Sequence, residues 1–211
     1  PKTKEFEQAF VDYLGNDKLY ASGLNSATSA LHLALKLLDI SSGANVAAPS
    51  LTFISTNHAI RYVNLYPTFV DVDKETGNMS PDDLERLLEE DRNDPCYAED
   101  EFLGFIKAII VVHYSGYPCD MDRINSIAKK YNIPVIEDCA HACGGSYANG
   151  KKIGDSENIC CFSFQAVKNL PIGDGGMLIT NNPEYKKRCD QLRWLGIDQD
   201  TYTRKNQTGD Y

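Results

Sequence analysis

A lysine that follows an apolar strand is the residue of this sequence best suited to covalent chemistry. Residues 161–164 predict a buried strand, Lys168 follows it, and a glycine-rich turn at 173–176 leads into a second apolar strand at 177–180. A lysine amine forms a Schiff base with a carbonyl when its pKa is low enough to leave part of it neutral. Most lysines are solvated, so Lys168 considered alone is more simply a surface residue of a connecting loop. Its interpretation depends on which residues the fold brings beside it.

A carboxylate at the end of another apolar strand is the second reactive candidate. Residues 133–136 predict a buried strand that ends in Glu137 and Asp138, whose side chains point to opposite faces of the sheet. A buried carboxylate needs a cationic partner or several hydrogen-bond donors, because otherwise it becomes protonated. A protonated pyridine nitrogen would serve Asp138 as that partner, and capping of the following segment is the alternative.

A turn of small polar residues opens the clearest helix of the sequence, at 27–38. The turn is Asn25-Ser26-Ala27-Thr28-Ser29. Its N–H groups, its hydroxyls and the positive end of the helix dipole suit a phosphate group. Ordinary N-capping by Asn25 or Ser26 explains the same residues. The sequence has neither the Walker pattern nor G-x-G-x-x-G, so a nucleotide-triphosphate loop and a Rossmann dinucleotide fingerprint are not supported.

Three further residues, Phe53, His141 and Ser163, fall at or just beyond predicted strand ends. Phe53 can stack on a planar ligand, or it can belong to the core as many aromatic residues do. Cys139, His141 and Cys143 would share a face in an extended chain, which suggests a soft metal site. No second cysteine or histidine pair lies at zinc spacing, so we expect no metal and interpret His141 as a hydrogen-bonded histidine. The sequence also lacks a Gly-x-Ser-x-Gly motif, so a serine hydrolase is not supported.

The elements that must position these residues alternate between strand and helix. Apolar runs predict strands at 19–21, 46–49, 68–72, 107–112, 133–136, 159–164 and 177–180. Periodicity and capping residues predict helices at 3–14, 27–38, 55–62, 120–131 and 183–195, and another that begins at 80–83. Residues 89–104 are charged and irregular, which predicts a surface excursion. The pattern indicates an α/β fold with a mainly parallel seven-stranded sheet and helices on both faces, whose ligands bind beyond the carboxyl ends of the strands.

The composition limits the classes of function. The 211 residues are 42% hydrophobic and 24% charged, which is ordinary for one large α/β domain. A formal net charge of −9 argues against a nucleic-acid partner, which requires a basic face. No apolar run reaches membrane-spanning length, no signal peptide is recognisable, and seven irregularly spaced cysteines favour a reducing, cytoplasmic setting. The sequence starts without methionine and ends in a polar stretch, so we expect it to be a piece of a longer protein.

Six segments together resemble one family in order and spacing. They are residues 25–35, 49–56, 69–73, 113–122, 135–142 and 162–170. The family is the DegT/DnrJ/EryC1/StrS group of pyridoxal-phosphate-dependent sugar aminotransferases, and the resemblance runs from about Phe6 to about Ile197. It implies the aspartate aminotransferase fold, fold type I. Residues 1–197 would form the cofactor-binding large domain with an incomplete N-terminus, and 198–211 would begin the connection to a missing C-terminal small domain.

The resemblance also implies a role for each candidate residue. Lys168 would be the Schiff-base lysine, Asp138 would pair with the pyridinium nitrogen, and His141 would lie near the phenolic oxygen of the cofactor ring. Phe53 would stack on the ring, and the phosphate would be held by Ala27, Thr28, Ser29 and Ser163. Two of these positions depart from the family pattern, since Ala27 stands where glycine is frequent and His141 where glutamine is common.

The implied reaction is transfer of an amino group from an amino acid, expected to be glutamate, to a keto sugar that is expected to be nucleotide-linked. The amino sugar would serve a polysaccharide or a glycosylated metabolite, and the enzyme would be a homodimer with a shared active site and no membrane partner. Lys168 argues against relatives that act as dehydratases and carry histidine at this position. Relatives that act on cyclitols or form an aromatic amino acid precursor, and a non-catalytic or regulatory relative, remain alternatives. We expect the 211-residue piece alone to be inactive or nearly so.

Overall fold

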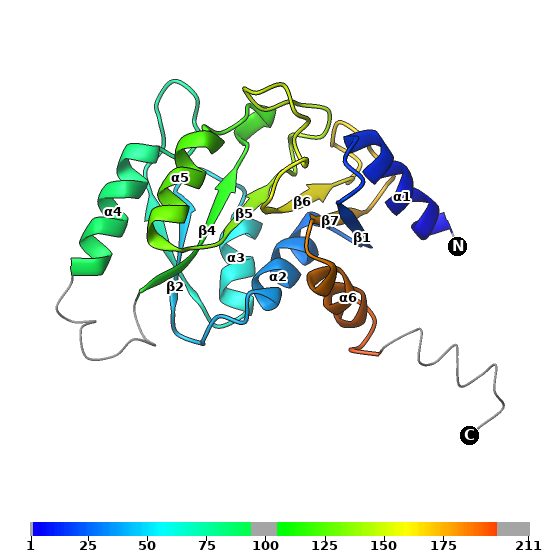
Figure 1. Cartoon of the computed structure of the whole chain (residues 1–211), viewed down its shortest axis with the longest axis horizontal. Helices are drawn as coiled ribbons and strands as arrows, with labels where there is room; N and C mark the ends of the chain where they lie inside the picture. The colour runs from blue at the N-terminus through cyan, green and yellow to red at the C-terminus, as the bar shows by residue number, and fades with distance from the viewer. Residues whose placement is uncertain (1, 94–104, 198–211) are drawn as a thin grey trace.

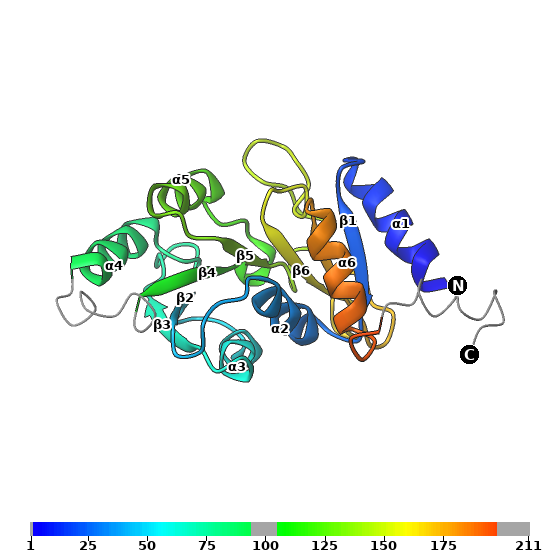
Figure 2. The ribbon, with the colours of Figure 1, turned by 60° about the horizontal axis from the view of Figure 1, so that its bottom comes forward.

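A seven-stranded sheet runs through the molecule and carries helices on both faces (Figures 1 and 2). The computed structural model describes residues 2–93 and 105–197. The strand order is β1-β7-β6-β5-β4-β2-β3, and β2 to β6 run parallel to one another. Among the strands of the described ranges, only β7 is antiparallel to its neighbours, β1 and β6. The prediction of a mainly parallel, seven-stranded sheet is therefore confirmed.

The elements follow the predicted order along the chain. The strands are β1 (Tyr20–Leu24), β2 (Asn45–Pro49), β3 (Tyr66–Val70), β4 (Ile106–Val112), β5 (Val135–Asp138), β6 (Ile159–Ser163) and β7 (Gly176–Thr180). The helices are α1 (Lys2–Leu14), α2 (Ala27–Leu37), α3 (Ile54–Tyr62), α4 (Pro81–Asn93), α5 (Met121–Tyr131) and α6 (Pro183–Leu192). A short 3-10 turn, η2 (Tyr114–Gly116), follows β4.

The segment 89–104, predicted as an irregular excursion, is helical in its first part. Helix α4 continues to Asn93, and an ion pair between Arg86 and Glu90 at 2.7 Å links successive turns of the helix. The prediction was wrong for 89–93 because a highly charged helix face has the composition of a loop. The rest of this segment, and the predicted domain connection at 198–211, lie outside the described residues.

Several other element ends differ from the prediction, and for two of them the backbone gives the cause. β3 spans 66–70 and not 68–72, because its ladder with β2 ends at the pair Pro49 and Val70. α6 ends at Leu192 and not at 195, because Leu195 and Gly196 adopt positive φ angles of 60° and 75° that turn the chain out of the helix.

The two faces of the sheet carry separate apolar cores. Helices α1, α4 and α5 cover one face, and α2, α3 and α6 cover the other (Figure 2). In β4, Ile109 and Val111 belong to the first core, whereas Ile110 belongs to the second. The continuous apolar run of β4 therefore reflects burial on both faces, as is usual for a central parallel strand.

Contacts on both sides of β1 hold α1 and α6 at the edge of the sheet. Phe10 of α1 packs edge-on against Phe162 of β6, with ring centroids 5.0 Å apart. Glu7 of α1 is buried, accepts a hydrogen bond from the Gly23 N–H at 2.8 Å, and pairs with Arg193 beyond α6. One carboxylate therefore links α1, β1 and the end of α6.

The carboxyl ends of the parallel strands and the start of α2 meet at one edge of the sheet. Leu24 of β1, Gly176 of β7 and Ser163 of β6 lie in one row across the strands. Asp138 at the end of β5 pairs with Cys161, two residues before Ser163. The turn that opens α2 is therefore a near neighbour of the end of β5.

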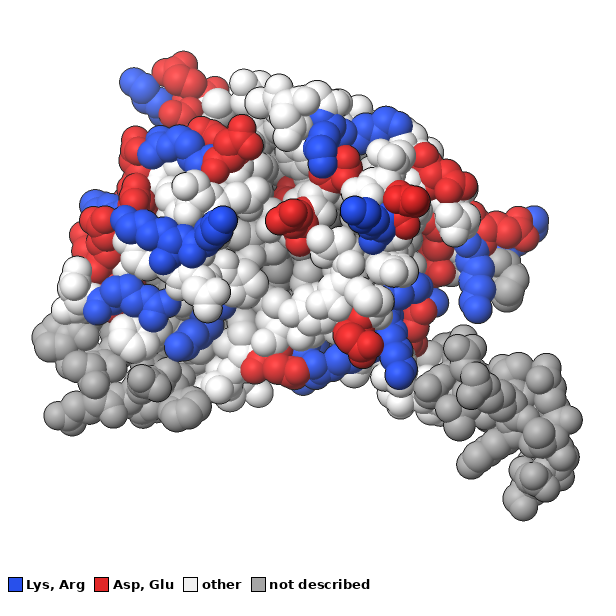
Figure 3. Space-filling model, viewed as in Figure 1, with Lys and Arg blue, Asp and Glu red and all other residues white. Residues whose placement is uncertain are grey.

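The helix lengths and the distribution of charged side chains bear on membrane and nucleic-acid partners. No helix within residues 2–93 and 105–197 is long and apolar enough to cross a membrane. On the face shown in Figure 3, lysine and arginine side chains are interspersed with aspartate and glutamate. Among the described residues of this face, the basic side chains form no continuous surface of the kind that binds nucleic acid.

Candidate active site

The site is built around Asp138, whose carboxylate is buried on the α2–α3 side of the sheet. The residue is 5% exposed, and its two carboxylate oxygens accept hydrogen bonds from the Thr56 hydroxyl at 2.8 Å and the Ala140 N–H at 3.1 Å. Burial raises the pKa of Asp138 above its usual value, although these donors and the nearby His141 and His113 act to lower it. Among the described residues, no lysine or arginine forms an ion pair with Asp138. Such a carboxylate is suited to a cationic partner, and a protonated ring nitrogen is one.

Lys168 lies on the loop after β6, at the same edge of the sheet. The residue is half-buried, and its backbone N–H donates to the Gln165 carbonyl at 2.9 Å. In the part of the chain that the structure describes, its ammonium group forms no ion pair and no hydrogen bond. The neighbouring Asn169 side chain donates to the carbonyls of His141 and Cys143, at 3.3 Å and 3.1 Å. These bonds tie the Lys168 loop to the segment that follows Asp138.

Both charged candidates, Lys168 and Asp138, influence the pKa of His141. Burial lowers its pKa below the ordinary value of 6.5, the positive charge of Lys168 lowers it further, and Asp138 acts in the opposite sense. Close packing fixes its backbone, since a Cβ on Gly116 would lie 2.8 Å from the His141 carbonyl oxygen. A neutral imidazole near pH 7 follows from the lowered pKa.

The soft metal site considered for Cys139, His141 and Cys143 has no geometric support. The chain turns after β5, with the Ala142 N–H donating to the Cys139 carbonyl at 2.9 Å, so the three residues do not lie in extended chain. Cys139 is fully buried, and its thiol points to the Glu137 carbonyl at 3.6 Å. His141 is only half-buried.

The turn that opens α2 has the features of an anion site. Ser26 is the N-cap, and its hydroxyl accepts from the Ser29 N–H at 3.1 Å. Ala27 is buried, whereas Thr28 and Ser29 are partly exposed at the helix start. The Ser163 side chain is buried beside the same turn, because Ser163 pairs with Gly176 in the sheet.

Gly176 sets how closely this turn approaches the sheet. A Cβ at this position would lie 2.2 Å from the Ser26 carbonyl carbon and 2.7 Å from the Ala27 nitrogen, both of which are backbone atoms. Only glycine therefore allows the start of α2 to rest on β7. A cavity of about 990 Å³ reaches the turn and is lined by Asn25, Ser29, Gly176 and Trp194, among others.

Phe53 is the aromatic residue of the site. It occupies the N-cap position of α3 and is 71% exposed, so the alternative that it belongs to the core is excluded. An exposed phenyl ring next to the first turn of α3 can stack on a planar ligand. The Phe53 carbonyl accepts a hydrogen bond from the Thr56 N–H at 3.1 Å, which connects the aromatic residue to the helix that also contacts Asp138.

The roles of two threonines of this region were not recognised from the sequence. Thr56 is fully buried and donates to Asp138, and its hydroxyl oxygen lies 2.8 Å from that of Thr52. The available signal was the position of Thr56 on α3, where it precedes the apolar Ala59 and Ile60 by three and four residues. That spacing places it on the buried face of the helix.

The adjacent Glu137 lies on the opposite face of β5, as predicted, and belongs to a separate buried network. Its Oε2 accepts from His113 Nε2 at 2.9 Å and the Tyr147 hydroxyl at 2.7 Å. Its Oε1 accepts from Ser156 at 2.6 Å and Asn158 at 2.8 Å. Burial acts to raise the pKa of Glu137, but these donors outweigh it and hold the pKa below its usual value. Both oxygens are fully engaged, so this network is a structural brace and offers no lone pair to a ligand.

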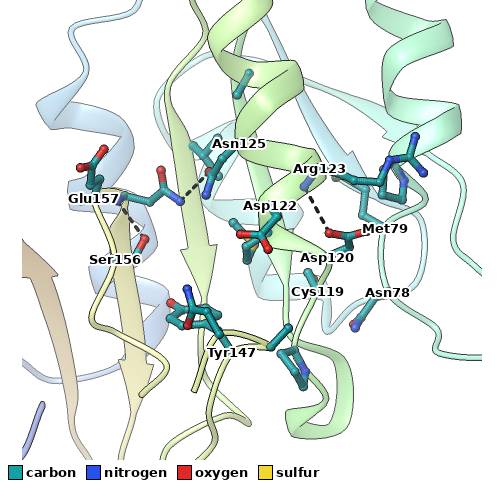
Figure 4. Close-up of a pocket in the computed structure, with 18 of the residues that line it drawn as sticks. Asn78, Met79, Cys119, Asp120, Asp122, Arg123, Asn125, Tyr147, Ser156 and Glu157 are labelled. Carbon is teal, nitrogen blue, oxygen red and sulfur yellow. Dashed lines mark hydrogen bonds between the residues drawn. The ribbon is translucent and has the colours of Figure 1, made fainter. Parts of the chain in front are cut away.

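A large cavity lies away from these candidates. It measures about 1050 Å³ and is lined by Asp120, Asp122 and Arg123 near the start of α5, and by Tyr147 and Glu157 of the loop before β6 (Figure 4). None of the predicted site residues lines it. The size of the cavity therefore does not locate the chemistry, which depends on the carboxyl edge of the sheet.

Comparison with known proteins gives consistent matches over the whole chain. The model of the DegT/DnrJ/EryC1/StrS aminotransferase family matches residues 1–210. The uncharacterized protein MJ1066 of Methanocaldococcus jannaschii is 40% identical over 211 residues, which are 100% of this chain and 50% of that protein. The crystal structure of DesV from S. venezuelae is 32% identical, with a TM-score of 0.83 over 94% of this chain and 49% of DesV. AtS13 from Actinomadura melliaura is 41% identical, with a TM-score of 0.81 over 94% of this chain and 51% of AtS13.

This chain thus spans about half the length of the relatives that it matches. The sheet order and the carboxyl-edge site agree with the fold expected from the resemblance, and the solved relatives share that fold. Because the family model covers nearly every residue, the chain belongs to the DegT/DnrJ/EryC1/StrS aminotransferase family.

Proposed function

We propose that the protein containing this chain is a pyridoxal-phosphate-dependent aminotransferase that acts on a keto sugar. The observation that carries the proposal is the buried Asp138 carboxylate, which lies at the same sheet edge as Lys168 and has no cationic ion-pair partner among the described residues. The similar structure of NtdA from Bacillus subtilis, 28% identical with a TM-score of 0.77, holds the bound cofactor PMP. That relative supports the same cofactor here.

The site residues would divide the work of holding the cofactor and moving protons. Pyridoxal phosphate supplies an electron sink for negative charge that develops on the substrate carbon. Asp138 would keep the ring nitrogen protonated, because carboxylate and pyridinium stabilise each other in a buried site. Lys168 would bind the cofactor covalently, and its freed amine would accept and return the proton of the substrate carbon. His141, neutral near pH 7, would hydrogen-bond to the ring oxygen.

The start of α2 would hold the phosphate, and Phe53 would cover one face of the ring. The Thr28 N–H lies in the first turn of the helix, where the dipole favours an anion. The Ser29 N–H already donates to the Ser26 hydroxyl, so Ser29 would contribute its own hydroxyl. The hydroxyl of Ser163 is at the neighbouring strand end. Ala27 contributes its backbone, since its methyl group is buried in the core.

We further propose a nucleotide-linked keto sugar as acceptor, glutamate as donor, and a homodimer that shares its active sites. The similar structure of DesI, 28% identical with a TM-score of 0.79, was determined in the presence of its TDP-sugar product, which supports the nucleotide-linked acceptor. Residues 1–197 would be the large domain of the full protein, and its small domain would complete the substrate site. Amino-sugar formation for polysaccharides is the proposed use.

Covalent attachment of the cofactor to one lysine tests this function. The protein is mixed with pyridoxal phosphate, the absorption spectrum is recorded, and borohydride reduction is followed by mass spectrometry of the peptides. We expect a visible band and a modified peptide that contains Lys168. The Lys168→Ala variant should lose both, whereas Lys151→Ala, at an exposed position beside the cavity near α5, should keep them. A reduced adduct that survives in Lys168→Ala would refute the assignment.

A further inference from the structure

We propose that Thr56 is a positioning residue of the cofactor site, whose hydroxyl, oriented by Thr52, fixes the carboxylate of Asp138. The proposal rests on the proposed function, since Asp138 acts there on the cofactor nitrogen. It concerns a contact between α3 and β5 that joins residues far apart in the sequence.

The direction of the hydrogen bonds in this contact is determined by chemistry. An ionised Asp138 carboxylate can only accept hydrogen bonds, so Thr56 must donate its single hydroxyl hydrogen to Oδ2, at 2.8 Å. The remaining bond between Thr56 and Thr52, also 2.8 Å, must then be donated by Thr52. The alternative acceptor for Thr52, the Phe53 carbonyl, is more distant at 3.4 Å. The three groups form a one-way chain from the partly exposed Thr52 to the buried acid.

This chain fixes the plane of the carboxylate. Thr56 contacts one oxygen and the Ala140 N–H contacts the other at 3.1 Å, so each oxygen has one immobile donor and one lone pair left for the site. Thr56 is itself held, because it is fully buried and its N–H donates to the Phe53 carbonyl at 3.1 Å. The same residue thereby sets the positions of the acid and of the residue that carries the aromatic ring.

Other polar groups around Asp138 do not replace this donor. His141 lies on the loop that follows Asp138, and the His113 ring is bound to Glu137 on the opposite face of β5. Neither histidine donates a hydrogen bond to Asp138 among the described residues. On β6, the buried Cys161 thiol lies next to the acid and has a pKa raised well above its usual value, so it stays neutral. Loss of the Thr56 hydroxyl would leave the carboxylate with one fixed donor.

The test compares Thr56→Val, which keeps the shape and removes the hydroxyl, with Thr56→Ser, which keeps the hydroxyl. The first measurement is the affinity for pyridoxal phosphate by equilibrium dialysis between pH 5.5 and 8.5. We expect Thr56→Val to weaken binding roughly tenfold or more, as for a lost bond to a charged group. In Thr56→Val, the fall in cofactor affinity on the acid side of the pH profile should occur at higher pH. The reason is that the Asp138 carboxylate has lost a hydrogen-bond donor that stabilises its charged form. Thr56→Ser should restore binding and the pH profile.

A second measurement does not depend on the cofactor. Carboxyl carbon NMR of the cofactor-free protein should show a higher Asp138 pKa in Thr56→Val than in the original protein, and a smaller increase in Thr52→Val. Ser55→Ala, which removes a half-buried hydroxyl of the same helix turn, should change neither the pKa nor the affinity. Thr52→Val also keeps the proposal testable if Thr56→Val does not fold.

A double-mutant cycle separates positioning from general structural support. In an Asp138→Ala background, Thr56→Val should cause no further loss of cofactor affinity. An equal loss in both backgrounds, or no rescue by serine, would overturn the role of Thr56. If the original protein does not bind pyridoxal phosphate at all, the proposed function fails. An unshifted Asp138 pKa in Thr56→Val overturns the positioning role whether or not the cofactor binds.

Discussion

Replacement of Glu137 by glutamine should destabilise the protein although the two side chains have nearly the same shape. The carboxylate accepts from two donors at each oxygen, namely His113 and Tyr147 at Oε2 and Ser156 and Asn158 at Oε1. Glutamine offers one oxygen and one NH₂ group, so one pair of donors must face another donor.

The cost follows from which donors can turn away. If the NH₂ group faces His113 and Tyr147, the tyrosine hydroxyl can rotate, but the histidine N–H is fixed because its Nδ1 accepts from the Cys119 N–H at 3.1 Å. If the NH₂ group faces Ser156 and Asn158, the serine can rotate, but the Asn158 amide is also committed to Asn125 at 3.0 Å. In either orientation, the glutamine NH₂ group faces one buried N–H donor that cannot turn away. We therefore expect a loss of about 2–3 kcal/mol in the free energy of unfolding.

Urea unfolding at several pH values measures this loss. The folded pKa of Glu137 is lowered, so its contribution is present above the unfolded pKa of about 4.3 and is lost as the pH falls through the folded pKa. The difference between the original protein and Glu137→Gln should be constant from pH 7 to about pH 5 and narrow below about pH 4.3. Glu157→Gln, at an exposed position of the same loop, is the matched control and should be neutral. Equal stability of Glu137→Gln and the original protein at pH 7 would refute this reasoning.

Two further predictions concern the sheet edge. Gly176→Ala should cost about 1–3 kcal/mol of stability and weaken pyridoxal phosphate binding, because its Cβ meets the backbone of Ser26 at 2.2 Å. Thermal unfolding and equilibrium dialysis measure both effects, with Gly145→Ala, which mainly meets the flexible end of Ile153, as the milder control. Proton NMR should show His141 titrating below pH 6.5, and Lys168→Ala should raise its midpoint by removing a positive charge. A midpoint at or above 6.5 in the original protein would contradict the predicted burial and charge effects.

The strands were predictable because each contributes apolar residues to a buried layer. The run 107–112 and the strand that ends at Asp138 both correspond to observed strands of the parallel part of the sheet. The antiparallel direction of β7 was not predicted. Its signal was the lack of any helix between 164 and 176, since a parallel neighbour needs a crossover and an antiparallel one does not.

The candidate site was only partly predictable, because the role of some of its residues depends on contacts between distant segments of the chain. Lys168, Asp138 and Phe53 have reactive or aromatic side chains that stand out at strand ends, and the resemblance suggested their roles. Thr56 was missed because a threonine in a helix has no distinctive pattern, and its importance depends on a contact with a residue of another strand. Sequence periodicity reports which face of a helix is buried, but it does not report which polar partner is found there.

The position of β1 has a consequence for how the protein folds. Residues 20–24 pair only with residues 176–180 among the described strands, so the first strand to be synthesised waits for the last before it gains a partner. Closing such a long loop costs chain entropy, and contacts of this range slow folding. The start of α2 rests on Gly176 of the same late strand. On a ribosome, the turn that opens α2 would therefore acquire its final shape only after β7 has emerged, and nascent chains that stop earlier would expose an unpaired strand edge to chaperones and proteases.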